Sequence, residues 1–301
     1  MDVTDPVSGV EHGLGPRPRS RVVRAALLTT MVLVGAAAVG GCSSEGGSTA
    51  DGSVSTASTS PDCEAVEPEP LGVEVVAVVA HDPGAYTQGL VMDGGRLFES
   101  TGRRGESELR ELDPATGDVL RSVDLPADHF GEGLAMTADG RLVQLTWQEE
   151  VAHVWDPDTF ESLGRFGYDG EGWGLATLGD STLVHSDGSD RLVRRDPDDF
   201  EALSSSTVQR VGGPADMLNE LEWDGTWLWA NRYQSDELLR IDPECGLVTG
   251  VADLGALRAD AVERAGGDPI DVTNGIAHIA GSDRYLVTGK WWPSMYEVRI
   301  T

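Results

Sequence analysis

A short motif recurs five times in this sequence, and its central residue changes chemical type from one copy to the next. The central residues are Gln88, Glu132, Trp173, Asn219 and Asn274. Two further residues, Trp147 and Lys290, follow apolar segments of the same repeats. A carboxyl group, an ammonium group, several amides and two indoles together suit a small polar group that is held by hydrogen bonds inside an apolar pocket.

The elements that must position these residues are short alternating strands, which begin at residue 73 and are separated by Gly, Asp and Pro turns. Asp-Pro turns begin at Asp113, Asp156, Asp196 and Asp242, so they recur every 40 to 46 residues. A period in the forties that carries several strands is typical of β-propeller blades. The five motifs therefore predict an all-β fold, a five-bladed β-propeller over residues 73–301.

Closure of the predicted ring needs a strand from the other end of the domain. No Asp-Pro turn follows the fifth motif before the chain reaches Thr301. We expect Val73 to Val79 to supply the missing outer strand of the last blade and so to remove an exposed edge. Residues 255–267 interrupt the period with apolar residues at helical spacing, which predicts a short inserted helix, either a lid or a surface connection.

The first residues have the layout of an export signal. A basic segment that contains Arg17 and Arg24 precedes an apolar run from Ala25 to Val39, which is too short for a membrane span. The run ends in Val39-Gly-Gly-Cys42, which resembles a bacterial lipobox. We therefore expect residues 1–41 to be a lipoprotein signal peptide, Cys42 to be lipidated and residues 42–72 to be a flexible tether. An ordinary cleaved secretory signal remains the alternative.

This layout places the domain outside the cytoplasm, on the outer face of the bacterial cell membrane. Two cysteines, Cys63 and Cys245, then remain in the mature chain, and the predicted closure brings their segments together. We predict a disulfide between them, with two free thiols as the alternative.

The formal charge of −29 disfavours nucleic acid and anionic membrane surfaces as partners. Membrane contact is therefore expected only through the lipid on Cys42. The six histidines show no zinc-ligand spacing, so neither a metal nor another cofactor is expected. A closed propeller of this kind is expected to be a monomer.

Several strings around the motifs resemble one family throughout the domain. They include Tyr86-Thr-Gln-Gly-Leu, Phe130-Gly-Glu-Gly-Leu, Gln144-Leu-Thr-Trp, Gly170-Glu-Gly-Trp-Gly-Leu, Leu218-Asn-Glu-Leu-Glu and Val287-Thr-Gly-Lys-Trp-Trp-Pro. Together they resemble the plant-and-bacterial glutaminyl-peptide cyclotransferases, from about Val73 to the C-terminus. The resemblance implies a five-bladed propeller that converts the N-terminal glutamine of peptides or proteins to pyroglutamate and releases ammonia.

The resemblance also implies roles for individual residues. Glu132 matches the catalytic glutamate, which would carry a proton from the attacking amine to the leaving nitrogen. Lys290 is the second expected catalytic residue, and it would orient the substrate amide or stabilise the oxyanion. The expected substrate-binding residues are Gln88, Trp147, Trp173, Asn219, Tyr233 and Asn274. Tyr233 stands near where the family usually has a tryptophan, and this departure weakens its assignment.

Two other functions remain open at this stage. One is a non-catalytic extracytoplasmic binding propeller, and the other is a metal-dependent propeller hydrolase or lactonase that uses Glu132, Asn219 and Asn274 as ligands. Glu171 repeats the Glu132 pattern, and we expect it only to satisfy backbone amides.

Overall fold

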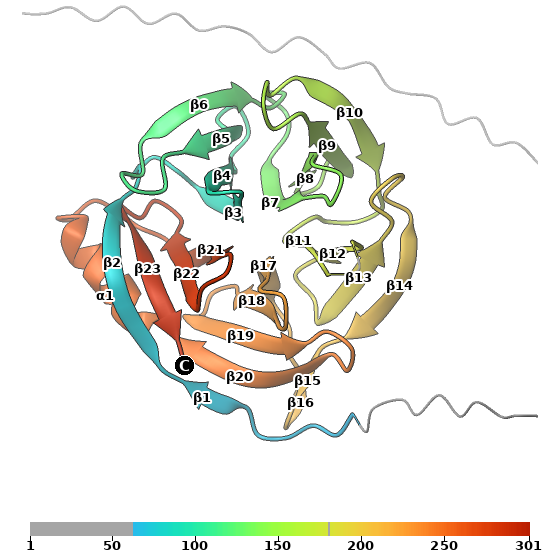
Figure 1. Ribbon diagram of the computed structural model, residues 1–301, viewed down its shortest axis with the longest axis vertical. Coiled ribbons are helices and arrows are strands. Elements are labelled where there is room, and N and C mark those ends of the chain that lie inside the picture. Colours follow the sequence, from blue (N-terminus) through green and yellow to red (C-terminus); the bar gives the residue numbers. More distant parts are fainter. Residues whose placement is uncertain (1–62, 180) are drawn as a thin grey trace, which may run out of the picture. The chain divides into compact units, whose positions relative to one another are not determined.

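The computed structural model describes residues 63–179 and 181–301, so the predicted signal peptide, Cys42 and most of the predicted tether lie outside the described residues. The described chain forms five sheets around a central axis (Figure 1). Four of the sheets have four strands each. The first contains β3 (Thr87–Asp93), β4 (Arg96–Thr101), β5 (Glu108–Leu112) and β6 (Val119–Asp124). The second contains β7 (Gly131–Met136), β8 (Leu142–Thr146), β9 (Val151–Trp155) and β10 (Ser162–Gly167).

The other two four-stranded sheets follow the same antiparallel order. The third contains β11 (Leu175–Thr177), β12 (Leu183–Ser186), β13 (Arg191–Arg195) and β14 (Ala202–Thr207). The fourth contains β21 (Thr273–Ile279), β22 (Arg284–Gly289), β23 (Ser294–Ile300) and β2 (Val73–Ala80). Because β2 pairs antiparallel with β23, the N-terminal segment supplies the outer strand of the last sheet, as expected.

The fifth sheet overturns the predicted fold class. It has seven strands, which are β1 (Glu69–Leu71), β15 (Gln209–Arg210), β16 (Gly213–Pro214), β17 (Leu218–Trp223), β18 (Leu228–Arg232), β19 (Glu237–Asp242) and β20 (Leu247–Asp253). The prediction of a five-bladed propeller is therefore wrong: the fold is all-β and propeller-like, with four blades and one larger, curled sheet.

The physical reason for the larger sheet lies at the outer edge of β20. Both β1 and β15 pair in parallel with β20, and β15 in turn forms a hairpin with β16. These short strands bind backbone groups that an outermost strand would leave open to other chains. The repeat pattern did not indicate them because each is only two or three residues long. β1 also lies in the last part of the predicted tether.

The innermost strands β3, β7, β11, β17 and β21 contact one another in turn and close around the axis (Figure 1). Glu220 on β17 is fully buried and reinforces this closure. Its two carboxyl oxygens accept hydrogen bonds from the backbone N–H groups of Leu90 (3.2 Å) and Ile276 (3.0 Å). One side chain thus joins β17 to β3 and β21.

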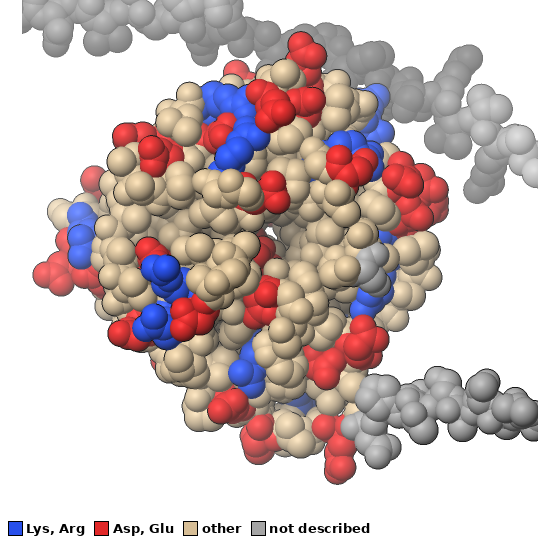
Figure 2. All heavy atoms as spheres, in the orientation of Figure 1, with Lys and Arg blue, Asp and Glu red and all other residues tan. Residues whose placement is uncertain are grey.

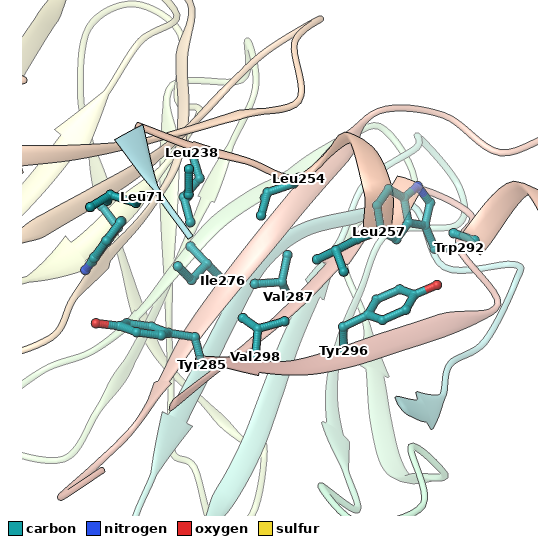
Figure 3. Packing of buried hydrophobic residues seen from close by; sticks show 13 residues of the cluster. Leu71, Leu238, Leu254, Leu257, Ile276, Tyr285, Val287, Trp292, Tyr296 and Val298 are labelled. Carbon is teal, nitrogen blue, oxygen red and sulfur yellow. The ribbon is translucent and has the colours of Figure 1, made fainter. Parts of the chain in front are cut away.

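The predicted insertion forms helix α1 (Gly255–Arg264), which packs against the sheet that contains β23. Leu257 and Ala261 of the helix belong to the buried cluster that also contains Trp292 and Tyr296, part of which is shown in Figure 3. The Tyr296 hydroxyl donates to Asp260 at 2.8 Å. The prediction of a short helix is confirmed. No helix within the described ranges is long and apolar enough to cross a membrane.

Acidic side chains are spread over the face seen in Figure 2, with arginines beside many of them. Ion pairs of exposed side chains include those of Arg299 with Glu74 (2.8 Å) and Asp283 (2.7 Å). Exposed pairs of this kind contribute little to stability, so the surface charge favours solubility more than folding.

A disulfide joins Cys63 to Cys245, with Cα atoms 5.4 Å apart, which confirms the predicted pair. Cys245 lies in the turn between β19 and β20, and Cys63 precedes β1, which pairs with β20. The bond therefore fastens the N-terminal segment to the edge that it covers.

Replacing both cysteines with serine should lower the free energy of unfolding by about 2–5 kcal/mol, because the bond closes a loop between residues 182 positions apart. Urea denaturation of the two proteins measures the difference. Neither cysteine lines the central cavity described below, so activity at low temperature should stay near that of the unaltered protein. An unchanged midpoint would contradict the stabilising role.

Candidate active site

A cavity of about 240 Å³ lies where the inner strands begin. It is lined by Tyr86, Gln88, Phe130, Glu132, Trp147, Trp173, Asn219, Tyr233 and Lys290. The structure thus brings together seven of the eight catalytic and substrate-binding residues that the sequence indicated. The eighth, Asn274, does not line the cavity and instead contacts Gln88 from behind.

Local breaks in strand pairing aim these side chains. The register between the inner strand and its neighbour shifts at Gln88 on β3 and at Glu132 on β7, and again at Asn219 on β17 and Asn274 on β21. A bulge of this kind releases a residue from the regular alternation and can redirect its side chain. The recurring motif therefore marks a bulge in four of the five inner strands, and in the third repeat Trp173 lies just before β11 instead.

The close approach of neighbouring inner strands explains why glycine recurs in the motif. A Cβ atom on Gly89 would lie 2.6 Å from the backbone nitrogen of Leu134, and one on Gly133 would lie 2.5 Å from that of Leu175. Neighbouring inner strands approach too closely for any larger residue. Glycine in the motif serves the packing of the ring, and beside Gly89 and Gly133 the variable residues Gln88 and Glu132 line the cavity.

Glu132 is buried, with 5% of its surface exposed. Gln88 donates from Nε2 to Glu132 Oε1 at 3.1 Å, and Asn274 donates from Nδ2 to Gln88 Oε1 at 3.2 Å. Asn274 therefore orients the Gln88 amide toward the carboxyl group. Burial raises the pKa of Glu132 well above its ordinary value, although the positive charge of Lys290 opposes this shift.

Lys290 supplies the positive charge of the cavity. Its ammonium nitrogen lies over the rings of Tyr86 (4.8 Å) and Tyr233 (5.2 Å), an arrangement that favours a cation. Burial lowers the pKa of Lys290, and the negative charges of Glu132 and Asp271 partly offset that effect. The cavity thus holds one buried acid and one buried base that stabilise each other's charged forms.

Asn219 presents an unused acceptor. Its Oδ1 atom is buried and has no hydrogen-bond partner within the described part of the chain. A buried acceptor without a partner is costly, so a bound group with an N–H donor would improve the site.

Tyr86 and Phe130 line the cavity but were missed from the sequence. Each stands two positions before a motif residue, Tyr86 before Gln88 and Phe130 before Glu132. An aromatic residue at the same position of two successive repeats was the signal that could have identified them. Their rings contact each other edge to face, with centroids 6.2 Å apart.

A second hollow, of about 420 Å³, lies at the other ends of the inner strands. Glu222 lines it, but no lysine, arginine or amide side chain does. Within residues 63–179 and 181–301 there is no group of three or more His, Cys, Asp and Glu side chains arranged to hold a metal ion. The smaller cavity is therefore the candidate active site.

Comparison with known proteins identifies the family of the chain. Residues 49–300 match the family model described as glutamine cyclotransferase. A glutaminyl-peptide cyclotransferase of Arabidopsis thaliana is 38% identical over 230 residues, which cover 76% of this chain and 71% of the plant protein. The crystal structure of a glutaminyl cyclase from Myxococcus xanthus superposes with a TM-score of 0.73 at 37% identity, covering 78% of this chain and 98% of that one.

Proposed function

The chain belongs to the glutamine cyclotransferase family and is a glutaminyl-peptide cyclotransferase, and from this premise we propose that the cavity around Glu132 is where N-terminal glutamine is cyclised. The observation that supports this location is the buried Glu132 carboxyl group, which faces a small aromatic cavity together with a buried lysine and two amides. The cavity is smaller than the roughly 300–1,000 Å³ of most ligand pockets, which suits a single amino-acid residue.

In the reaction, the α-amine of the substrate attacks the carbonyl carbon of its own side-chain amide. A new C–N bond closes the ring, the old C–N bond breaks, and ammonia leaves. The amine must lose a proton and the leaving nitrogen must gain one. A single carboxylate can do both in turn, and Glu132 is the carboxylate that lines the cavity.

Lys290 and the amides act on the other charges of the reaction. The carbonyl oxygen becomes negative as the amine adds, and the Lys290 ammonium group and the Gln88 Nε2 donor can stabilise it. The free Oδ1 acceptor of Asn219 can bind an N–H group of the substrate. Together they fix the two ends of the substrate side chain relative to Glu132.

The aromatic wall holds the substrate in a folded conformation. Phe130 contacts Trp147 with ring centroids 5.6 Å apart, and Trp173 contacts Tyr233 at 5.4 Å. Such a wall excludes water and brings the amine close to the amide carbon, an orientation effect that can be large.

We further propose that the enzyme is exported, that it is anchored to the outer face of the membrane by a lipid on Cys42, and that it acts as a monomer. The Cys63–Cys245 disulfide supports export, because such bonds persist mainly outside the cytoplasm. Metabolic labelling with a fatty acid tests the anchor: label should enter the intact chain and be absent from Cys42→Ser.

The reaction is tested by following ammonia release from a dipeptide that begins with glutamine. The purified protein should release ammonia, and the same peptide with an acetylated α-amine should give none, because the nucleophile is blocked. Activity should persist in EDTA, which separates this mechanism from a metal-dependent hydrolase. Absence of ammonia above background would contradict the assignment, and loss of activity in EDTA would contradict the metal-free mechanism.

A further inference from the structure

A closed ring of contacting side chains surrounds the cavity. All of them are aromatic except Lys290 and Glu171. Tyr86 contacts Phe130, Phe130 contacts Trp147, and Trp173 contacts Tyr233. Lys290 closes one gap because its ammonium nitrogen lies over both tyrosine rings. The second gap, between the two indoles, is closed by Glu171.

Glu171 accepts hydrogen bonds from both indoles. Its Oε2 atom lies 2.8 Å from Trp147 Nε1 and 3.0 Å from Trp173 Nε1. Its Oε1 atom accepts from Gln148 Nε2 at 2.9 Å. These contacts differ from the sequence-based expectation, in which Glu171 served only backbone amides. Trp147 lies in the loop between β8 and β9, and Trp173 lies just before β11, so this carboxylate joins loops of two neighbouring sheets.

The chemistry of these contacts favours a carboxylate, because both of its oxygen atoms accept hydrogen bonds. An indole N–H is only a donor, and two such donors converge on a single oxygen atom, which therefore needs two free lone pairs. A carboxylate oxygen provides them, and hydrogen bonds to a charged acceptor are stronger than neutral ones. Although partial burial opposes ionisation, the hydrogen bonds from Gln148, Trp173 and Trp147 lower the pKa of Glu171. The side chain is therefore ionised at neutral pH.

The position of Glu171 in the repeat supports a role at the cavity. It stands two residues before Trp173, as Tyr86 and Phe130 stand two residues before their own motif residues. In the third repeat, a carboxylate occupies the place of a wall aromatic.

We propose that Glu171 is a positioning residue of the cyclisation reaction, which holds both indoles of the substrate-binding wall in place and adds negative charge beside Glu132. The proposal rests on the proposed role of this cavity. In this role Glu171 does not contact the reacting atoms.

The added charge is one of several that face Glu132. Burial has the largest effect on the pKa of Glu132 and raises it. The positive charge of Lys290 lowers that pKa, and the negative charges of Glu171 and Glu149 raise it. The hydroxyl groups of Tyr86 and Tyr168 also interact with Glu132. Removing the charge of Glu171 should therefore move the pH at which Glu132 ionises toward lower values.

The proposal is tested with Glu171→Gln, Glu171→Asp and a control variant. Glu171→Gln should lower kcat/KM by about 10- to 100-fold, mainly through a higher KM, because it weakens two charge-assisted hydrogen bonds and loosens the wall. The acidic limb of its pH profile should move to lower pH. Glu171→Asp keeps the charge on a shorter side chain, so KM should rise while the acidic limb stays in place.

The control is Asp187→Asn, which removes a nearby negative charge that affects Glu171 and has no hydrogen bond to either indole. Its KM should be unchanged. A Glu171→Gln protein with normal KM, or with a lower kcat alone, would overturn the positioning role.

The indole N–H signals of the unaltered protein give a readout that does not depend on activity or on a substitution at Glu171. The two NMR signals are assigned with Trp147→Phe and Trp173→Phe. Both should shift together as Glu171 is protonated, at a pH below 4.5, the ordinary pKa of a glutamate side chain. Signals that do not respond to that titration would overturn the proposal even if Glu132 proves to be the proton carrier. Signals that shift together while Glu132 proves dispensable would sustain the indole contacts and contradict only the proposed mechanism.

Discussion

Replacing Glu132 with glutamine is expected to lower kcat by about 10²- to 10⁴-fold, the range that positioned acid–base groups contribute. The amide has nearly the same shape and can still contact Gln88, but it cannot take a proton from the amine and pass it to the leaving nitrogen. KM should change little because the aromatic wall and Lys290 remain. Ammonia release from a glutamine dipeptide measures both constants.

A matched control is Glu222→Gln, which makes the same change at a carboxyl group of the second hollow. Burial raises the pKa of Glu222 to about 8, so this group is largely uncharged at neutral pH and its replacement should leave activity intact. Full activity in Glu132→Gln would reject the proposed proton transfer. A similar loss in both variants would show that the effect is not specific to the active site.

The same assignment gives the pH dependence of kcat/KM, which reports the ionisation of groups in the free enzyme. Glu132 must be ionised to accept the proton, and its pKa is raised, so activity should fall on the acidic side at a pH well above 4.5. Lys290 must be protonated to stabilise the oxyanion, and its pKa is lowered, so activity should fall on the alkaline side below 10.5. A flat profile between those values would contradict the pairing of these two groups.

The largest effect on stability is expected at a buried ion pair behind the cavity. His81 and Glu99 are both buried, and His81 Nε2 lies 2.9 Å from Glu99 Oε1. The other ring nitrogen of His81 lies 2.9 Å from the carbonyl oxygen of Trp292. Because both ring nitrogens face acceptors, both carry protons and the ring is a cation. Thr87, beside Gln88, also donates to Glu99 at 2.7 Å.

His81→Ala should therefore lower the free energy of unfolding by about 3–5 kcal/mol, because it leaves the Glu99 carboxylate buried without its main partner. Urea denaturation measures the loss. Arg299→Ala removes two exposed ion pairs and serves as the control, with a midpoint close to that of the unaltered protein. Equal stability of His81→Ala and the parent would contradict the charged pair.

The stability that this pair contributes should depend on pH. Burial opposes the charge of His81, but attraction to Glu99 and hydrogen bonds raise its pKa above 6.5, so its contribution is complete below pH 6.5 and is lost as pH rises through the raised value. Burial also opposes the charge of Glu99, yet His81 and Arg110 lower its pKa below 4.5. The stability that ionised Glu99 contributes is complete above pH 4.5 and is lost as the pH falls through its lowered pKa. The effect of His81→Ala should be largest between pH 4.5 and 6.5.

The sequence by itself determined the parts of this protein that depend on local pattern. The alternation of apolar residues and the spacing of Asp-Pro turns predicted an all-β ring, and the varied motif residues predicted a polar site in an apolar pocket. Seven of the nine residues that line the cavity could be named because each belongs to a repeat, and repeats bring equivalent positions together around one axis.

Tertiary structure decided what depends on contacts between distant segments. The seven-stranded sheet arises because β1 and β15 pair with β20, and strands of two or three residues leave no periodic signal. The carboxylate of Glu171 receives two indoles from loops of two neighbouring sheets, which spacing along the chain could not reveal. The pairing of His81 with Glu99 likewise depends on burial, because in water the two charges would attract only weakly. Local sequence specifies which side chains each strand presents, whereas closure of the ring decides which of them meet.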